Sequence, residues 1–197
     1  MLNIGVLISG GGTNLQAIID ETKSGGINGT VKLVISNKEN AYGLERARLS
    51  KIKAVYETDE DKIIELLKEN NIDLIVLAGY LSILDGDILK EFRNKIINIH
   101  PSLIPSFCGK GYYGEKVHQG VIDYGAKVTG ATVHFVDEGA DTGAIIMQEA
   151  VNVEQDDDAK SLAKRVLEVE HRILKESIRL FCENKLSIQG RRVFINE

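Results

Sequence analysis

The alternation of apolar runs and helical spacing along the chain predicts its secondary structure. Continuous apolar runs, which are typical of strands buried on both faces of a sheet, occupy residues 4–8, 31–36, 74–78 and 96–99. A shorter run at 54–56 predicts a further small strand. Helical spacing of apolar residues covers 13–22, 42–49, 59–70 and 87–92. Strands that alternate with helices are joined by crossovers, so we expect a parallel sheet with helices on both faces.

The last third of the chain has a different pattern. Two longer apolar stretches, 127–136 and 144–153, flank a glycine-containing turn, and we expect them to pair as a hairpin. A short helix is predicted at 118–123. A long helix from 159 to about 184 follows three acidic residues, whose charge the helix dipole favours. Residues 186–197 could add an edge strand. Without repeats or a Pro- or Ser-rich linker, residues 1–197 are expected to form a single domain.

Composition narrows the class of protein. The 197 residues carry a formal net charge of −5 and contain no run rich in Lys or Arg, which argues against nucleic acid as a partner. Cys108 and Cys182 lie far apart without metal-ligand spacing and are expected to be reduced thiols in a cytoplasmic protein. No apolar run approaches the ~20 residues of a membrane helix, and the apolar start of the chain is expected to be a strand rather than a signal peptide.

A glycine-rich segment follows the first predicted strand. The glycines at 10–12 precede Thr13 and Asn14 at a helix start, where unpaired backbone N–H groups carry partial positive charge. Glycine lets the backbone approach an anion, so a phosphate is the natural ligand; the alternative is a tight strand-to-helix turn with Thr13 as the helix cap. Leu15 stands where the dinucleotide fingerprint needs a third glycine, and the Gly-Lys-Ser/Thr of the nucleotide loop is absent. The segment therefore suits a phosphate monoester better than NAD or ATP.

Asn98 and His100 lie at the end of the fourth apolar run, just before Pro101. Side chains alternate along a strand, so both point to the same side, and proline stops the strand there. They would then project at the carboxyl end of a parallel strand, where open α/β sheets bind ligands. An Asn amide can donate to a developing oxyanion, and a His can do so when protonated or can take a proton from an attacking amine. The alternative is a polar pair that satisfies local backbone groups. Since no nucleophile elbow is present, we expect acyl transfer without a covalent enzyme intermediate.

An acidic turn separates the two longer strands and contains Asp137, Glu138 and Asp141. A carboxylate beside His100 would raise the pKa of the histidine and accept its proton. A solvated turn is the alternative, and it is preferred for Asp137 and Glu138. The spacing is not that of a calcium loop and the chain has no Cys/His cluster, so we expect no metal.

Two histidines and one glutamate stand among apolar neighbours. His134, inside a predicted strand, is expected to be a satisfied core or edge histidine, and His118 is expected to begin a helix. Glu170 lies on or beside the apolar stripe of the long helix, where a carboxylate is costly unless it is paired. It therefore either pairs with an Arg or Lys or holds a cationic or amine ligand.

Five short segments match, in chain order, the pattern of one enzyme family. They are the glycine segment 10–14, Leu77-Ala78-Gly79-Tyr80, Asn98-Ile99-His100-Pro101-Ser102-Leu103, Asp141-Thr142-Gly143 and Glu170-His171. On these segments the chain resembles the phosphoribosylglycinamide formyltransferases, and the resemblance extends from Leu2 to about Phe181. The resemblance implies an α/β, Rossmann-like formyltransferase fold with a mostly parallel central sheet and helices on both faces. It also implies a transferase of purine biosynthesis and one-carbon metabolism, which moves a formyl group from 10-formyl-tetrahydrofolate to an amine through a tetrahedral intermediate.

The resemblance further implies roles for individual residues. The catalytic trio is matched by Asn98, His100 and Asp141. The contact with the glycinamide end of the substrate is matched by Glu170, and the substrate-phosphate loop by Gly12, Thr13 and Asn14. The folate pocket is matched by Leu81, Ser82, Ile83 and Leu84, together with Asn98. The formyl donor is a co-substrate, and no metal is required. The protein is expected to be a cytoplasmic monomer or homodimer that acts on small molecules, with neither nucleic acid nor a membrane as partner.

Two features depart from the family pattern, and two other functions remain open. Residues 107–114 form a longer and more glycine-rich segment, and Ser82 stands where the family often has a basic residue. A 10-formyl-tetrahydrofolate hydrolase would use the same trio with water as the acceptor. Such enzymes usually carry an N-terminal regulatory domain, which we do not expect here. A non-catalytic phosphate-binding module would explain the glycine segment but not the trio.

Overall fold

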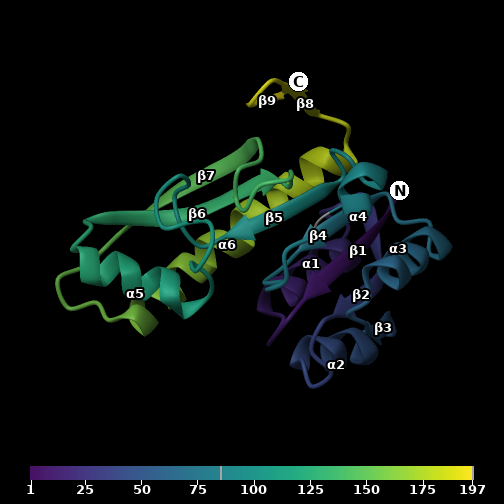
Figure 1. Ribbon diagram of the computed structural model, residues 1–197, viewed down its shortest axis with the longest axis horizontal. Coiled ribbons are helices and arrows are strands. Elements are labelled where there is room, and N and C mark those ends of the chain that lie inside the picture. The colour runs from purple at the N-terminus through teal and green to yellow at the C-terminus, as the bar shows by residue number, and fades with distance from the viewer. Residues whose placement is uncertain (85, 197) are drawn as a thin grey trace.

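The computed structural model describes residues 1–84 and 86–196, and its helices and strands follow the predicted order (Figure 1). The first half contains β1 (Leu2–Ile8), α1 (Thr13–Ser24), β2 (Gly29–Ser36), α2 (Tyr42–Leu49), β3 (Lys53–Tyr56), α3 (Glu60–Glu69), β4 (Leu74–Leu77), α4 (Gly86–Glu91) and β5 (Ile96–His100). The second half contains α5 (Glu115–Tyr124), β6 (Val128–Phe135), β7 (Ile145–Asn152), α6 (Ala159–Cys182), β8 (Leu186–Gln189) and β9 (Arg192–Ile195). The tail forms a two-stranded hairpin where the sequence predicts at most one edge strand, and Glu197 lies outside the described residues.

The strands form one sheet with the order β3-β2-β1-β4-β5-β6-β7-β9-β8. The five strands β1 to β5 run parallel, whereas β6 is antiparallel to β5 and β7 to β6, so the α/β class and the predicted hairpin are confirmed. The chain passes from β1 outward to β2 and β3 and then returns to β4 on the other side of β1. Loops after β1 and β4 therefore diverge at the carboxyl edge of the sheet, which is where ligands bind in such folds.

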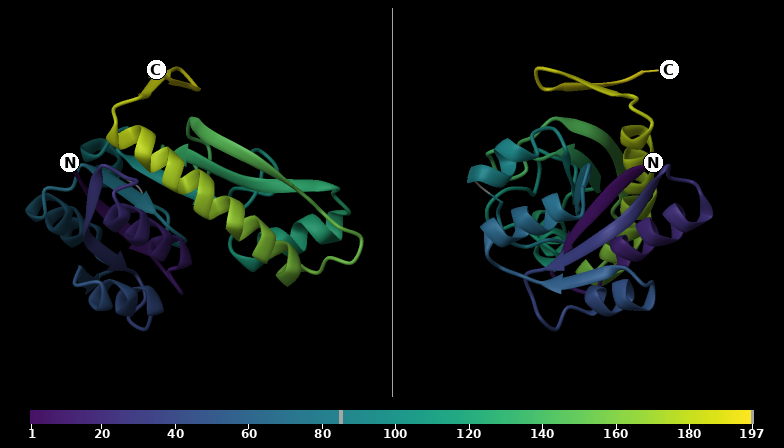
Figure 2. Two further views of the ribbon diagram at one scale, coloured as in Figure 1. Left: turned by 180° about the vertical axis from the view of Figure 1, so that it is seen from behind. Right: turned by 90° about the vertical axis from the view of Figure 1, so that its right-hand side faces the viewer.

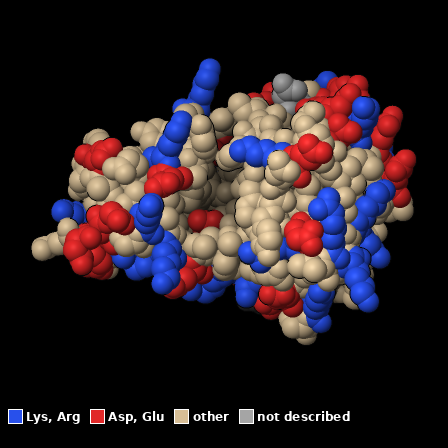
Figure 3. Space-filling view, turned by 90° about the horizontal axis from the view of Figure 1, so that it is seen from below, with Lys and Arg blue, Asp and Glu red and all other residues tan. Residues whose placement is uncertain are grey.

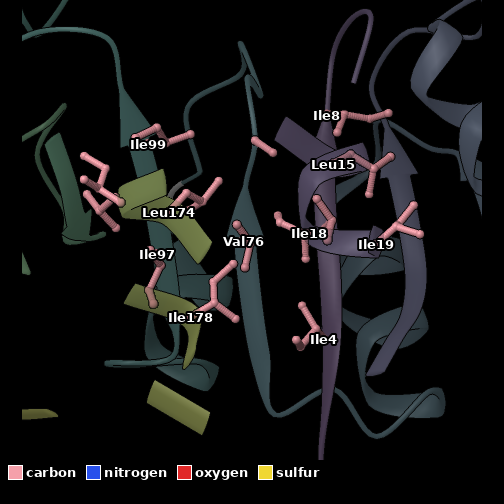
Figure 4. Close-up of a cluster of buried hydrophobic side chains, with 14 of the residues drawn as sticks. Ile4, Ile8, Leu15, Ile18, Ile19, Val76, Ile97, Ile99, Leu174 and Ile178 are labelled. Carbon is pink, nitrogen blue, oxygen red and sulfur yellow. The ribbon is translucent and has the colours of Figure 1, made fainter. Parts of the chain in front are cut away.

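Alternation along the central strands gives the sheet two buried faces, as the continuous apolar runs predict. Ile4, Val6 and Ile8 of β1 belong to a core cluster with residues of α1, β4, β5 and α6. Figure 4 shows Ile8 beside Leu15 of α1, and Val76 of β4 beside Ile97 of β5 and Ile178 of α6. Leu7, which lies between Val6 and Ile8 in the strand, points to the other face and belongs to a second cluster with residues of α3 and α4. One cluster therefore lies on each face of the sheet.

Two local details differ from the predictions. Gly12, with φ 72°, is the N-cap of α1, and Thr13 is the first helical residue; no side chain caps this helix, so the proposed cap by Thr13 was wrong. His118 lies within α5, which begins at Glu115, and does not begin that helix. The acidic run before α6 is structural as predicted, since Asp158 forms a capping box with Ser161.

The C-terminal hairpin stands apart from the body of the molecule (Figure 2) and meets it beside the acidic turn. Arg192 of β9 pairs with Ile145 at the start of β7. Arg191 donates to the carbonyl oxygen of Thr142 at 3.0 Å. The last strands therefore brace the segment that carries Asp141.

Candidate active site

A cavity of about 300 Å³ opens at the carboxyl ends of β4 and β5. This is the lower end of the size range of small-molecule sites. Its walls come from the segment after β4, the end of β5, the glycine-rich segment 109–114 and the acidic turn. The residues expected to line a folate pocket, Leu81, Ser82, Ile83, Leu84 and Asn98, all lie in this wall. Figure 3 shows this side of the molecule hollowed between the part that carries α5 and the part that carries α2, with uncharged residues over much of the hollow.

The fold brings the expected trio together at one end of the cavity. Asp141, which has φ 57°, places one carboxylate oxygen 3.5 Å from Nδ1 of His100 and the other 3.4 Å from Nδ2 of Asn98. The backbone N–H of Gly109 donates to the same carboxylate at 2.8 Å. Burial disfavours the charged form of Asp141, but the positive charge that the neighbouring His134 and His100 rings carry when protonated, together with the hydrogen bond from Gly109, outweighs this effect and lowers its pKa. Asp141 is therefore a carboxylate near neutral pH.

His100 is buried, and each of its ring nitrogens faces an oxygen atom. Nε2 lies 2.9 Å from the Phe107 carbonyl oxygen, so this nitrogen carries the hydrogen of the neutral ring and Nδ1 faces Asp141. Burial lowers the pKa of His100 below its ordinary value, although Asp141 and the Phe107 carbonyl both act to raise it and His134 acts to lower it further. Asp141 thus acts on the pKa of His100 in the predicted direction, but the net shift is downward because desolvation of the imidazolium is the larger effect.

His134 lies next to the trio rather than in the core away from it. It stands opposite Asn98 in the β5–β6 register. Nδ1 of His134 lies 2.7 Å from the Phe135 carbonyl oxygen and so carries the hydrogen, which leaves Nε2 to accept from Asn98 Nδ2 at 3.1 Å. The histidine is satisfied, as predicted, but it also fixes the amide of Asn98. Pairing register is the signal that would have identified this contact.

The second candidate group joins α1 to α6. Asn14 Nδ2 donates to Glu170 at 2.8 Å, and both side chains are buried. Burial raises the pKa of Glu170, and the bond from Asn14 opposes this rise. Within the described residues Glu170 pairs with neither Arg nor Lys, which excludes the first of the two predicted alternatives. Oδ1 of Asn14 is buried without a hydrogen-bond partner there, so Asn14 and Glu170 together offer acceptors to a hydroxyl or amine.

None of the helices described is long and apolar enough to cross a membrane. Over residues 1–84 and 86–196, three or more His, Cys, Asp or Glu side chains nowhere gather in a way that could hold a metal ion.

Comparison with known proteins places the chain in a family. The model of the family described as formyl transferase matches residues 2–178. The phosphoribosylglycinamide formyltransferase of Haemophilus influenzae is 41% identical over 206 residues, with 100% of this chain and 94% of that protein covered. The chloroplastic enzyme of the same name from Vigna unguiculata is 40% identical over 93% of this chain, and the chain spans 62% of its length.

Solved structures give the same result. Glycinamide ribonucleotide transformylase 1 from Symbiobacterium toebii superposes with a TM-score of 0.94 at 46% identity and covers 100% of this chain and 95% of that one. A formyltetrahydrofolate deformylase from Pseudomonas syringae superposes with a TM-score of 0.89 at 24% identity, over 100% of this chain and 66% of that one, and this likeness concerns the fold alone. With a family match over residues 2–178 and the trio gathered at its cavity, the chain belongs to the formyl transferase family.

Proposed function

We propose that this protein, acting as a single domain, transfers a formyl group from 10-formyl-tetrahydrofolate to the amine of phosphoribosylglycinamide in de novo purine biosynthesis. The observation that carries the proposal is the meeting of Asn98, His100 and Asp141 at one end of the cavity. The identity of 41% with the enzyme of this name from Haemophilus influenzae supports the choice of substrates. The protein is proposed to act in the cytoplasm on small molecules, as a monomer or homodimer.

The cavity wall after β4 is suited to the formyl donor. Leu81 and Ile83 are 47% and 70% exposed and lie in the cavity wall. Large apolar side chains left open at a cavity mark a surface that a ligand covers. The flat pterin ring system of a folate is such a ligand. Ser82, which accepts a hydrogen bond from Asn37 at 2.7 Å, supplies a neutral group where the family often has a basic one.

Neutral His100 is the proton acceptor of the reaction. The substrate amine attacks the formyl carbon, the carbonyl π bond becomes an oxyanion, and the attacking nitrogen gains a positive charge. Nδ1 of His100 carries no hydrogen in the neutral ring and takes the excess proton, directly or through the adjacent Asp141. The resulting imidazolium is stabilised by Asp141 and donates from Nδ1 to the oxyanion. When the tetrahedral intermediate collapses, the proton passes to N10 of tetrahydrofolate, which leaves.

Asn98 supplies the second donor to the oxyanion. One hydrogen of its amide is held by His134 at 3.1 Å, and the other faces Asp141 at the long distance of 3.4 Å. The weaker of these bonds is the one that a developing oxyanion displaces. Loss of one such donor costs about 10²–10³-fold in turnover in other acyl-transfer enzymes.

The acceptor substrate lies between the trio and α1. Glu170 and Oδ1 of Asn14 accept from its amide or hydroxyl groups, and the glycine segment ending at Gly12 and Thr13 binds its phosphate through backbone N–H groups. This arrangement would place the amine of the substrate towards the cavity and its phosphate towards the start of α1.

Formyl transfer measured with and without the amine tests the function. Release of tetrahydrofolate that depends on phosphoribosylglycinamide, with one formylated amine formed per donor consumed, is the expected result. Equal release in the absence of the amine would instead identify a hydrolase. The variant Asn98→Ala serves as the control for the site, because it should lose turnover while retaining binding of the amine.

A further inference from the structure

The glycine segment is in direct contact with α2. The backbone N–H of Gly43 donates to the carbonyl oxygen of Gly10 at 3.0 Å. A Cβ atom on Gly12 would lie only 2.8 Å from Cα of Gly43. The first turn of α2 is thus fixed against the segment, and the next turn carries Arg46 to the start of α1.

The guanidinium of Arg46 is held there by neutral groups. Nε donates to the carbonyl oxygen of Gly11 at 2.7 Å, and Nη1 donates to Gln16 at 3.3 Å. The guanidinium carbon also lies 5.0 Å from the centre of the Tyr42 ring. These contacts orient the half-buried side chain, and within the described part of the chain they leave Nη2 without an acceptor.

The carboxylates near Arg46 interact with groups other than its guanidinium. Among the residues described, no ion pair includes Arg46. Glu45 faces Arg48 at 3.6 Å, Glu21 pairs with Lys175 at 2.8 Å, and Asp20 accepts from Gln16 at 2.8 Å. A half-buried guanidinium with only neutral partners has an uncompensated charge, which an anionic ligand would neutralise.

A hollow at the start of α1 offers the room for such an anion. Its lining includes Thr13, Gln16, Arg46, His171 and Lys175, together with Ala17, Asp20 and Glu21. The first backbone N–H groups of α1, a helix of 12 residues, are unpaired there and carry partial positive charge. Asn14, which follows Thr13 in the first turn of α1, is only 8% exposed, and its Oδ1 has no hydrogen-bond partner within the described residues, so a ligand bound at this helix start would complete its hydrogen bonding.

We propose that Arg46 binds the phosphate of the amine substrate and makes the enzyme selective for phosphorylated acceptors. This assignment rests on the proposed function for the identity of the amine. The carbonyl of Gly11 and the amide of Gln16 orient the guanidinium so that its free N–H groups meet phosphate oxygens bound by the N–H groups of the glycine segment. Guanidinium groups pair with phosphate through two parallel hydrogen bonds, which a lysine cannot reproduce.

The test compares Arg46→Gln and Arg46→Lys with the control Arg48→Gln, which lies two residues further along the same helix and whose side chain is exposed. With phosphoribosylglycinamide, the KM of Arg46→Gln should rise about 10–100-fold, because charge-assisted hydrogen bonds are lost. The KM for the formyl donor, and kcat/KM for the same amine without its phosphate, should stay unchanged. Arg46→Lys should recover only part of the affinity. An equal loss with both amines would show that Arg46 merely supports the loop, and would overturn the proposal.

A second measurement does not depend on formyl transfer. Inorganic phosphate should raise the melting temperature of the wild-type protein and of Arg48→Gln, but not that of Arg46→Gln. A phosphate response that is the same in all three proteins would refute the role of Arg46 even if the wild type transfers formyl groups. Conversely, a response that requires Arg46 in a protein without transferase activity would retain the phosphate site and reject the proposed function.

Discussion

Replacing Asp141 with Asn removes one negative charge beside His100 and keeps the shape of the side chain. Nδ1 of His100 lies 3.5 Å from the carboxylate, and the two side chains are 6% and 16% exposed. At this distance, Coulomb's law gives about 1 kcal/mol in bulk water and about 5 kcal/mol at an effective dielectric constant of ~20. Since ~1.4 kcal/mol corresponds to a tenfold change, the ratio of imidazolium to imidazole should fall by about tenfold or more.

The sign follows from the burial of His100. Desolvation already lowers the pKa of His100, and Asp141 is the largest of the contributions that oppose it. Asp141→Asn should therefore lower that pKa further. Turnover should fall by about 10²–10⁴-fold, because the imidazolium forms only during the reaction, while the KM of either substrate changes little. NMR titration of the His100 ring, beside steady-state kinetics, measures both effects.

The control is Glu138→Gln, which removes an equal charge from an exposed position in the same turn. It should change neither the titration of His100 nor the turnover. If the titration of His100 were the same in Asp141→Asn as in the wild type and activity were retained, the carboxylate would have no electrostatic role, and another proton acceptor would be required.

Three further predictions concern other parts of the site. His100→Ala should lower turnover by about 10²–10⁴-fold, with a melting curve that still shows one cooperative transition, and near-normal turnover would reject the mechanism. Gly12→Val should weaken binding of the phosphorylated amine and leave binding of the formyl donor intact, as calorimetry would show, because a Cβ there lies 2.8 Å from Cα of Gly43 and φ is 72°. Burial, and then the proximity of His100, lowers the pKa of His118 from 6.5 to about 4, so the unfolded chain takes up the proton first and stability falls as pH drops through that window. The difference of about 2.5 in pKa, at ~1.36 kcal/mol for each unit, corresponds to a loss of roughly 3 kcal/mol in the free energy of unfolding at acid pH. In urea denaturation, His118→Gln should lack most of this loss, and an unchanged acid sensitivity would contradict the assignment.

The parallel sheet was predictable because its determinants are local. The continuous apolar runs at β1, β2, β4 and β5 follow from burial on both faces, and helical spacing between them fixes the crossovers. Pro101 marks the end of β5, which placed Asn98 and His100 at the carboxyl edge. Asp141 lies far from these residues in the sequence, so its place beside His100 depended on the fold bringing the acidic turn to the end of β5.

The details of the site depend on packing that no local pattern records. The Phe107 carbonyl reaches His100 because of the path of a loop, and His134 meets Asn98 because of the β5–β6 register. The direction of the His100 pKa depends on how far burial exceeds the effect of Asp141, and a sequence does not give a degree of burial. The sequence does not single out Arg46, because an arginine on a short helix is usually solvated. Only the structure shows that the neighbouring carboxylates of Glu45 and Glu21 pair with other cations.

The position of α6 has a consequence for synthesis of the protein on the ribosome. Leu174 and Ile178 of this helix lie in the same cluster as Ile4 and Val76, on the central strands (Figure 4). A chain emerges at about 5–20 residues per second, so β1 to β5 leave the ribosome several seconds before the helix that covers one of their faces. During that interval the nascent sheet exposes the residues that α6 later buries. A product that ends before Ala159 should retain this exposure permanently, and it is therefore expected to depend on chaperones and to aggregate where the full-length chain does not.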